Sequence, residues 1–228
     1  MDLQLQISAV KKRLASAALK SGRKVGEIKI LYATKYASAQ QIAQLAAIEP
    51  RAAIGENRVQ DAEKKFEELA QLIGPEKFRA MEKHFIGNLQ SNKVRPAVKL
   101  FDCIQSVDSV GLAGKISRCA AGQGKTMCIY LEVNNGELRK QGASFEGLEA
   151  LVLGARTLPS VRLVGLMGMG VDGDPDSTRA FFRKLRNAAG KYGLKTSMGM
   201  SGDFEAAIEE GSDMVRLGRA VFAGPDGK

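Results

Sequence analysis

The sequence is poor in the residues that most often build metal centres, nucleophilic triads and disulfide frameworks. Its 228 residues contain one histidine, no tryptophan and three cysteines (Cys103, Cys119 and Cys128) without CxxC spacing. An odd number of scattered cysteines argues against a disulfide framework or a thiolate metal site. Because His84 is the single histidine and stands at the start of an apolar segment, we expect a core or wall residue rather than a general base or metal ligand.

Long apolar runs and blocks of like charge are also missing. No stretch approaches the roughly 20 apolar residues that cross a bilayer, and the first 20 residues lack the apolar region of a secretory signal. The net charge is +9, but the basic residues are scattered and no aromatic ladder accompanies them, so a nucleic-acid role is not expected. These features predict a cytoplasmic protein without a membrane partner, whose positive charge suits small anions.

Eight short apolar segments alternate with helical patterns, as in a parallel sheet covered by helices. A doubly wound sheet would carry a glycine-rich turn after its first strand, whereas the first segment here ends in Thr34-Lys35-Tyr36. We therefore predict an α/β protein with one domain over residues 1–228, a (β/α)₈ TIM barrel with residues 1–24 as an N-terminal helical extension packed on it. The expected strands are 28–34, 52–57, 84–88, 103–108, 126–134, 161–170, 194–199 and 213–218. The expected helices are 3–21, 38–49, 58–73, 91–99, 109–121, 144–156, 176–191 and 202–211.

Lys35 is the first unusual residue at the end of a predicted strand, where barrel proteins place their chemistry. A lysine that points into a partly desolvated barrel mouth favours the neutral amine, which is the form that makes a Schiff base. The alternative is a solvated lysine in the first loop. Its position in the chain does not decide between the two.

The segments that follow the seventh and eighth predicted strands indicate an anion site. SMGMSGDFEAAI begins at Ser197 and VRLGRAVFAG surrounds Gly218, and each runs through a glycine turn into a helix. Backbone N–H groups at such turns bind anions, and these two loops are the common phosphate site of the fold. Ser197 would add a hydroxyl donor and Arg219 a charge. In the alternative reading, Ser201 only caps its helix and the glycines only allow tight packing.

Arg216 lies two residues inside the end of the eighth predicted strand, among apolar neighbours. A buried arginine needs a partner. That partner is either a salt bridge inside the barrel or the ring nitrogen of a bound heterocycle.

Six segments together resemble the YggS/PROSC family of pyridoxal phosphate homeostasis proteins. The resemblance implies a barrel like the N-terminal domain of bacterial alanine racemase, with pyridoxal 5′-phosphate (PLP) held as a Schiff base on Lys35. It also implies an Asn57 contact near the ring, Arg216 at the ring nitrogen, and phosphate contacts from Ser197, Gly218 and Arg219. Arg219 departs from the family, because many relatives have threonine there. The segments are ATKYASAQQI, IGENRVQDAEKK, HFIGNLQSNKVR, LEVNNGELRKQG, GLMGMG and SMGMSGDFEAAIEEGSDMVRLGRAVFAG.

The same resemblance suggests a carrier rather than an enzyme. An arginine at the ring nitrogen weakens the cofactor as an electron sink, and a racemase needs a second base on the opposite face of its substrate. In alanine racemases a second domain supplies that base, and Ala39 replaces their tyrosine four residues after the lysine. We expect a monomeric, non-catalytic protein that stores or delivers PLP, with apo PLP-dependent enzymes as transient partners. The alternatives are a weak PLP-dependent amino-acid racemase and a phosphate-binding barrel unrelated to PLP.

Overall fold

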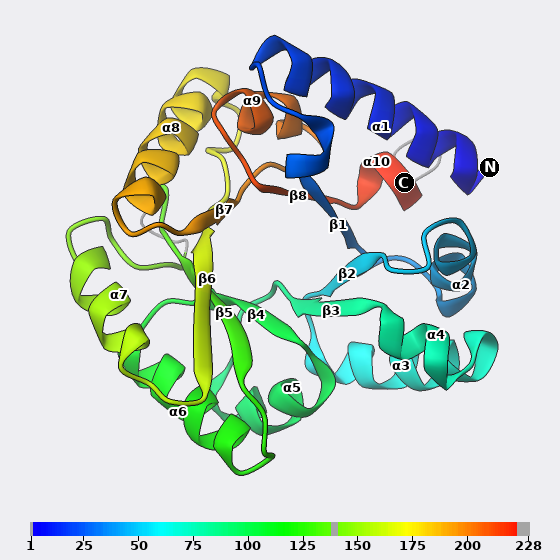
Figure 1. Cartoon of the computed structure of the whole chain (residues 1–228), viewed down its shortest axis with the longest axis horizontal. Coiled ribbons are helices and arrows are strands. Elements are labelled where there is room, and N and C mark those ends of the chain that lie inside the picture. Colours follow the sequence, from blue (N-terminus) through cyan, green and yellow to red (C-terminus); the bar gives the residue numbers. More distant parts are fainter. Residues whose placement is uncertain (1, 138–140, 223–228) are drawn as a thin grey trace.

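The eight strands form a closed parallel barrel in which each strand pairs with the next along the chain and β8 pairs with β1. The structure, a computed structural model, describes residues 2–137 and 141–222, so three residues of the LEVNNGELRKQG segment and the end of the chain lie outside it. Helices surround the strands on all sides (Figure 1). The predicted (β/α)₈ fold is confirmed.

Each observed strand overlaps one of the predicted apolar segments and is one to three residues shorter. Strand β3 departs most from the prediction, because it begins at Glu82, two residues before the predicted start. The register of β1 against β8 places Leu31 beside Arg216, so the two strand ends that carry Lys35 and Arg216 are direct neighbours. The strands are β1 (Lys29–Ala33), β2 (Ala53–Glu56), β3 (Glu82–Phe85), β4 (Cys103–Val107), β5 (Met127–Glu132), β6 (Val161–Met167), β7 (Lys195–Ser197) and β8 (Met214–Leu217).

The long helices also follow the predicted pattern, with differences at their ends. Ser38 caps α2 with a reciprocal capping box, which explains the start of that helix. Two short helices, α4 and α10, lie outside the predicted set because helices of six and four residues carry little periodicity. The helices are α1 (Leu3–Lys20), α2 (Ala39–Ile48), α3 (Val59–Ile73), α4 (Pro75–Ala80), α5 (Val94–Leu100), α6 (Val110–Ala121), α7 (Leu148–Arg156), α8 (Pro175–Lys191), α9 (Phe204–Glu209) and α10 (Arg219–Phe222), with 3₁₀ turns η1 (Val25–Glu27) and η2 (Ser91–Lys93).

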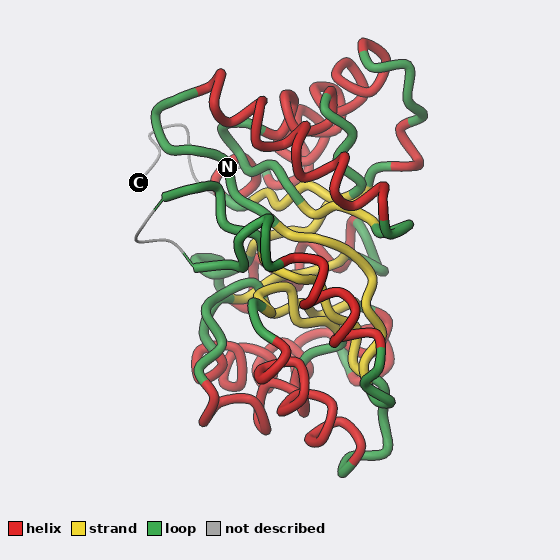
Figure 2. The backbone as a smooth tube through the Cα atoms, turned by 90° about the vertical axis from the view of Figure 1, so that its left-hand side faces the viewer, coloured by secondary structure: helices red, strands yellow, loops and turns green. Residues whose placement is uncertain are grey.

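The core has two layers, one between the barrel and its helices and one inside the barrel. Figure 2 shows the strands crossing the middle of the molecule with helices on both sides. Apolar helix faces fill the outer layer, as in α3, which buries residues at helical spacing. The inner layer is a small apolar cluster with polar groups among it. Its buried members are Leu31, Ala53, Cys103, Tyr130, Met167 and Met214.

Helix α1 is the extra N-terminal element, and it packs on the outside of the barrel against α9 and α10 (Figure 1). The Asp2 carboxylate caps its first turn, and Arg13 donates to Glu205 of α9 at 2.7 Å. Helix α1 therefore packs against and stabilises the helices that follow β7 and β8. None of the helices in residues 2–137 and 141–222 combines the length and apolar character that a membrane-spanning segment needs.

Candidate functional site

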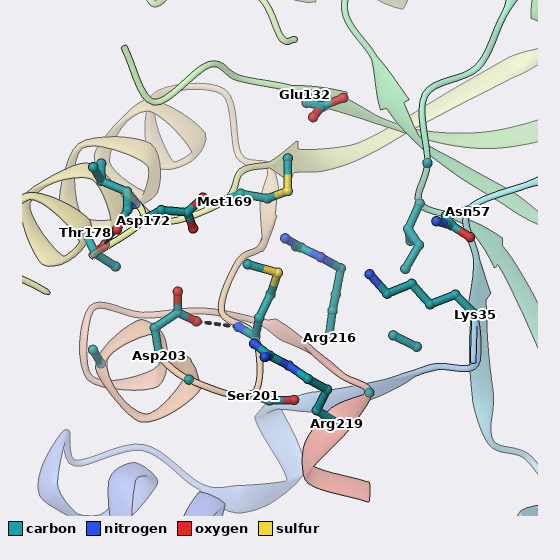
Figure 3. Close-up of a pocket in the computed structure, with 18 of the residues that line it drawn as sticks. Lys35, Asn57, Glu132, Met169, Asp172, Thr178, Ser201, Asp203, Arg216 and Arg219 are labelled. Atoms are coloured by element: carbon teal, nitrogen blue, oxygen red, sulfur yellow. Dashed lines mark hydrogen bonds between the residues drawn. The ribbon is translucent and has the colours of Figure 1, made fainter. Parts of the chain in front are cut away.

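A cavity of about 940 Å³ opens at the carboxyl ends of the strands, where the loops after β1, β2, β3, β6, β7 and β8 converge. Five of the six predicted site residues line it: Lys35, Asn57, Arg216, Gly218 and Arg219. Figure 3 shows the Lys35 and Arg216 side chains entering the same space from neighbouring strands. The structure thus brings together residues that are up to 184 positions apart in the chain.

Lys35 follows β1 by two residues and lies in a turn at the cavity rim. Its side chain is exposed, and its Nζ lies 4.9 Å from the centre of the exposed Tyr36 ring. Of the two readings that the sequence left open, the exposure agrees with a solvated lysine in the first loop. The amine nevertheless lines the cavity, so its accessibility suits a nucleophile that meets a ligand from solution.

A buried ion pair fixes the turn that carries Lys35. Lys65 of α3 donates to the Thr34 carbonyl and to the Glu56 carboxylate, both at 2.8 Å, and the Thr34 hydroxyl donates to Glu56 at 2.7 Å. Glu56 is 1% exposed. A buried carboxylate is stable only when it is paired and hydrogen bonded, so these three residues act as one unit. A glutamate at the end of an apolar strand was the signal in the sequence, but its partner could not be read from the chain.

Arg216 is nearly buried and is held from two sides. Nη1 donates to the Ser197 carbonyl at 2.6 Å and to its hydroxyl at 3.0 Å, while Nη2 donates to the Gly168 carbonyl at 2.8 Å. Desolvation lowers the pKa of Arg216 to about 10, so the guanidinium stays charged at neutral pH. No carboxylate in the described part of the chain forms an ion pair with it within 4.0 Å. Of the two readings of Arg216, the structure therefore disfavours the salt bridge inside the barrel.

Ser197 does not reach the cavity, which corrects its predicted place at the anion site. The residue is fully buried in β7, where its hydroxyl donates to Gln105 at 2.7 Å and accepts from Arg216. Strand β7 ends at Ser197, and its side chain points into the barrel interior below the cavity. The predicted phosphate contact of Ser197 therefore has no support from the lining of the cavity.

Ser201 is the serine of the same segment that does face the cavity. It lines the cavity, and its hydroxyl accepts from the Ala220 backbone N–H at 3.1 Å, which joins the loop after β7 to the start of α10. The first N–H groups of a helix have no partner inside that helix. A side chain on Gly218 would come within 3.0 Å of the Ala33 carbonyl, so this glycine permits the close approach of the turn to β1. The Ser201 hydroxyl and the turn at Gly218 and Arg219 thus lie together at the cavity. Figure 3 shows Ser201 beside Arg219.

Glu132 is a carboxylate of the cavity that sequence patterns did not single out. It ends β5, is 5% exposed and lines the cavity across from Arg216 (Figure 3). Desolvation raises its pKa to about 7, although the charge of Arg216 opposes the shift. Burial likewise raises the pKa of Asp203, whose carboxylate accepts from the Met200 N–H at 2.5 Å. Glu132 can therefore hold or release a proton near neutral pH.

Replacement of Glu132 by glutamine should change how stability depends on pH. The pKa of Glu132 is higher in the folded chain than in the unfolded one, so wild-type stability falls as pH rises from about 4.5 to about 7. A shift of this size corresponds to about 3 kcal/mol. In urea unfolding, the free energy of Glu132→Gln minus that of wild type should rise by about this amount between pH 5 and 8. Glu63→Gln, on the exposed side of α3, is the matched control. A difference for Glu132→Gln that stays constant with pH would contradict the buried acid.

The other titratable candidates lie away from the cavity. His84 is 1% exposed inside the barrel, in agreement with its expected place in the core. Cys103 is buried, and Cys119 and Cys128 are partly buried thiols. Within residues 2–137 and 141–222, no group of three or more histidine, cysteine, aspartate and glutamate side chains is arranged to hold a metal ion.

Known proteins match this chain over nearly its whole length. Residues 10–225 match the family described as alanine racemase, N-terminal domain. A pyridoxal phosphate homeostasis protein of Pseudomonas aeruginosa is 36% identical over 228 residues, covering 96% of this chain and 94% of the relative. The corresponding protein of Aquifex aeolicus is 35% identical over 226 residues, covering 95% and 96%. Each of these alignments covers more than nine-tenths of both proteins.

Solved structures give the same result in three dimensions. PipY of Synechococcus elongatus, solved with PLP bound, superposes with a TM-score of 0.78 at 33% identity, covering 93% of this chain and 99% of PipY. An alanine racemase of Clostridium difficile has a TM-score of 0.70 at 15% identity, and the chain covers 56% of it. The second likeness concerns the fold alone.

Proposed function

Because this chain belongs to the alanine racemase N-terminal domain family, and matches pyridoxal phosphate homeostasis proteins over nearly its whole length, we propose that it binds PLP and acts in PLP homeostasis. We propose further that PLP is held as a Schiff base on Lys35. The observation that carries the proposal is the convergence of the Lys35 amine, the Arg216 guanidinium and the Ser201–Arg219 turn on one cavity.

The chemistry of these residues fits the three functional ends of PLP. The exposed Lys35 amine is accessible to an aldehyde, and Arg216 is a donor suited to a ring nitrogen. The turn at Gly218 and Arg219, with the Ser201 hydroxyl, offers donors to a phosphate. Asn57 lines the side of the cavity near Lys35, which suits a contact to the ring (Figure 3). Ser201 takes the role first assigned to Ser197.

A carrier fits these residues better than an enzyme. When bound, PLP supplies an electron sink, and a donor such as Arg216 at the ring nitrogen weakens that property. The exposed Lys35 suits loading and release from solution, as a monomeric protein that passes PLP to apo enzymes would require. One observation favours a second candidate function, weak amino-acid racemization: Glu132 faces the cavity with a pKa of about 7, which is suitable for a general acid or base.

The spectrum of the purified protein with added PLP tests the proposal. We expect an imine absorbance band that disappears when borohydride reduces the imine to a stable secondary amine, and the added mass should then lie on the peptide that contains Lys35. Deuterium exchange at the α-carbon of a panel of amino acids separates the two functions. A carrier gives no exchange above free PLP, whereas exchange that Glu132→Gln abolishes would support the racemase. Failure of the band to form would overturn PLP binding at Lys35.

Ser201→Ala should weaken binding of the phosphate group in particular. A hydrogen bond to a charged group contributes about 1.5 kcal/mol, so the ratio of the affinities for PLP and for unphosphorylated pyridoxal should fall roughly tenfold. Both affinities can be measured by absorbance titration. The matched control is Ser197→Ala, which removes a hydroxyl below the cavity and should leave this ratio unchanged. The opposite result would return the phosphate role to Ser197.

A further inference from the structure

A chain of hydrogen bonds crosses the barrel interior from the amino ends of the strands to the cavity. Arg216 Nη1 lies 3.0 Å from Ser197 Oγ, which lies 2.7 Å from Gln105 Oε1. The other end of that amide, Gln105 Nε2, lies 2.8 Å from His84 Nδ1, and His84 Nε2 lies 2.7 Å from the carboxylate of Glu82. Gln105 and Ser197 are fully buried, so water does not compete for these bonds.

The hydrogen bonds of this series all have a fixed direction of proton donation. A guanidinium has only donors, so Ser197 accepts from Arg216 and gives its own proton to Gln105 Oε1. The amide of Gln105 then donates to His84 Nδ1, which must be an acceptor. The imidazole proton therefore lies on Nε2 and is donated to Glu82. Each residue's orientation thus depends on that of the residue before it.

Protonation of His84 would break this order. A proton on Nδ1 needs an acceptor, so Gln105 would have to turn its carbonyl oxygen toward the imidazole. The Gln105 NH₂ group would then face Ser197, which already accepts from Arg216, and the serine proton would lose its acceptor. A buried polar group without a partner is costly. A proton on His84 Nδ1 would therefore destabilise the arrangement of Gln105 and Ser197 that holds Arg216.

We propose that Gln105, Ser197 and His84 are positioning residues of the cofactor site, which hold the Arg216 guanidinium and couple its occupation by a ligand to the protonation of His84. The inference rests on the proposed function, because the ligand at Arg216 is PLP. Coupling of this kind is reciprocal: if PLP favours the present arrangement, it disfavours protonation of His84, and acid weakens PLP binding to the same extent.

The ionisable groups around His84 have pKa values that keep their own charge fixed near neutral pH. Hydrogen bonds from His84 and Lys29 lower the pKa of Glu82 to about 2, so Glu82 remains an acceptor. Burial raises the pKa of the Cys103 and Cys128 thiols and of the Tyr130 phenol, which keeps them neutral. Histidine is the side chain that ordinarily titrates in the physiological range. Other charged groups at this end of the barrel are Arg162 on β6, Lys195 on β7 and Asp213 before β8. The neighbouring Lys83 of β3 is paired with Asp102 at 3.0 Å, and Lys125 lies near that pair.

The single histidine of the chain makes the proposal directly measurable. In protein labelled with ¹⁵N-histidine, NMR spectra report the ring tautomer of His84 and its protonation against pH. We expect a proton on Nε2 in the neutral form. Addition of PLP should shift the ring signals and lower the proton affinity of His84 about fivefold, at the low end of measured couplings between sites.

Gln105→Met breaks the chain without a large change of volume. It should abolish the response of His84 to PLP and weaken PLP binding about fivefold, as expected for loss of one or two hydrogen bonds. Ser197→Ala removes the next link in this chain of hydrogen bonds. It replaces Gln105→Met in the experiment if that variant does not fold. Tyr130→Phe is the matched control, because Tyr130 belongs to the same interior cluster and lies off the chain. It should keep both the response and the affinity.

The outcomes separate this inference from the proposed function. If PLP is fixed on Lys35 while the His84 signals stay unmoved, the coupling is overturned and the proposed function stands. If PLP does not bind, the proposed function fails. Arg216→Lys then tests the chain of hydrogen bonds in the protein without ligand. That substitution should shift the His84 signals. Unchanged signals would contradict the coupling of Arg216 to His84 through these hydrogen bonds as well. A response that persists in Gln105→Met would also contradict it.

Discussion

Lys35→Ala should abolish covalent retention of PLP and remove the imine absorbance band. No other lysine lines the cavity among the described residues, so the described cavity offers no replacement amine. Loss of the covalent link should reduce PLP retention more than about 100-fold, or about 2.7 kcal/mol. Gel filtration after mixing with PLP, followed by absorbance of the protein fraction, measures the effect. The remaining contacts from Arg216 and Ser201 should leave weak, reversible binding.

Two further variants make the Lys35 result specific. Lys35→Arg keeps the positive charge but has no nucleophilic amine, so it should behave as Lys35→Ala does if the link is covalent. Lys64→Ala removes an exposed lysine of α3 outside the cavity and should retain PLP as wild type does. A normal imine band in Lys35→Arg would show that another amine forms the link, whereas retained PLP without that band would show that charge alone holds it.

Gly87→Ala should have the largest effect on stability among single methyl additions near the site. A Cβ on Gly87 would lie 2.1 Å from the Asn57 carbonyl oxygen, which is far inside contact distance. Because that oxygen belongs to the backbone, it cannot swing aside as a flexible side chain could. Forced overpacking usually costs 1–3 kcal/mol, and we expect about 3 kcal/mol here. For a chain of this length, that lowers the melting temperature by roughly 6–12 °C. PLP binding should weaken as well, because Asn57 must move.

Gly111→Ala is the matched control for the glycine prediction. Gly111 lies on the exposed side of α6, and a Cβ there would meet nothing within 4 Å. Alanine has the higher helix propensity, so stability should stay the same or rise by up to about 1 kcal/mol. Thermal unfolding followed by circular dichroism measures both variants. Equal melting temperatures for Gly87→Ala and wild type would contradict the close approach of these two loops.

Local patterns predicted the barrel well because each of its units is encoded locally. A buried parallel strand reads as a short apolar run and a covering helix as a 3.6-residue period, so eight repeats can be counted before any contact is known. Helix α7 shows the limit: it begins at Leu148 and not at 144, because residues 144–147 form a turn closed by the Gly147 N–H and the Ser144 hydroxyl. Short side chains that bond to nearby backbone compete with helix at such ends.

The site was predicted less completely because a pattern gives position along the chain but not direction. Ser197 and Ser201 are four residues apart in one turn-rich segment, and only the end of β7 decided which hydroxyl faces the cavity. Glu132 looks like an ordinary strand residue until β5 and β8 bring it opposite Arg216. The Glu56–Lys65 pair and the Gln105–His84 contact likewise join residues whose sequence gives no sign of each other.

The sequence by itself determined the fold, the order of its strands and the lysine at the end of the first one, because periodicity and strand ends are local properties. The tertiary structure alone decided which groups share the cavity and which are sealed inside the barrel. Closure of the barrel sets the direction of every strand-end side chain, so it turned Ser197 inward and Ser201 toward the cavity. Burial then decided which carboxylates and cations are paired and which face a ligand.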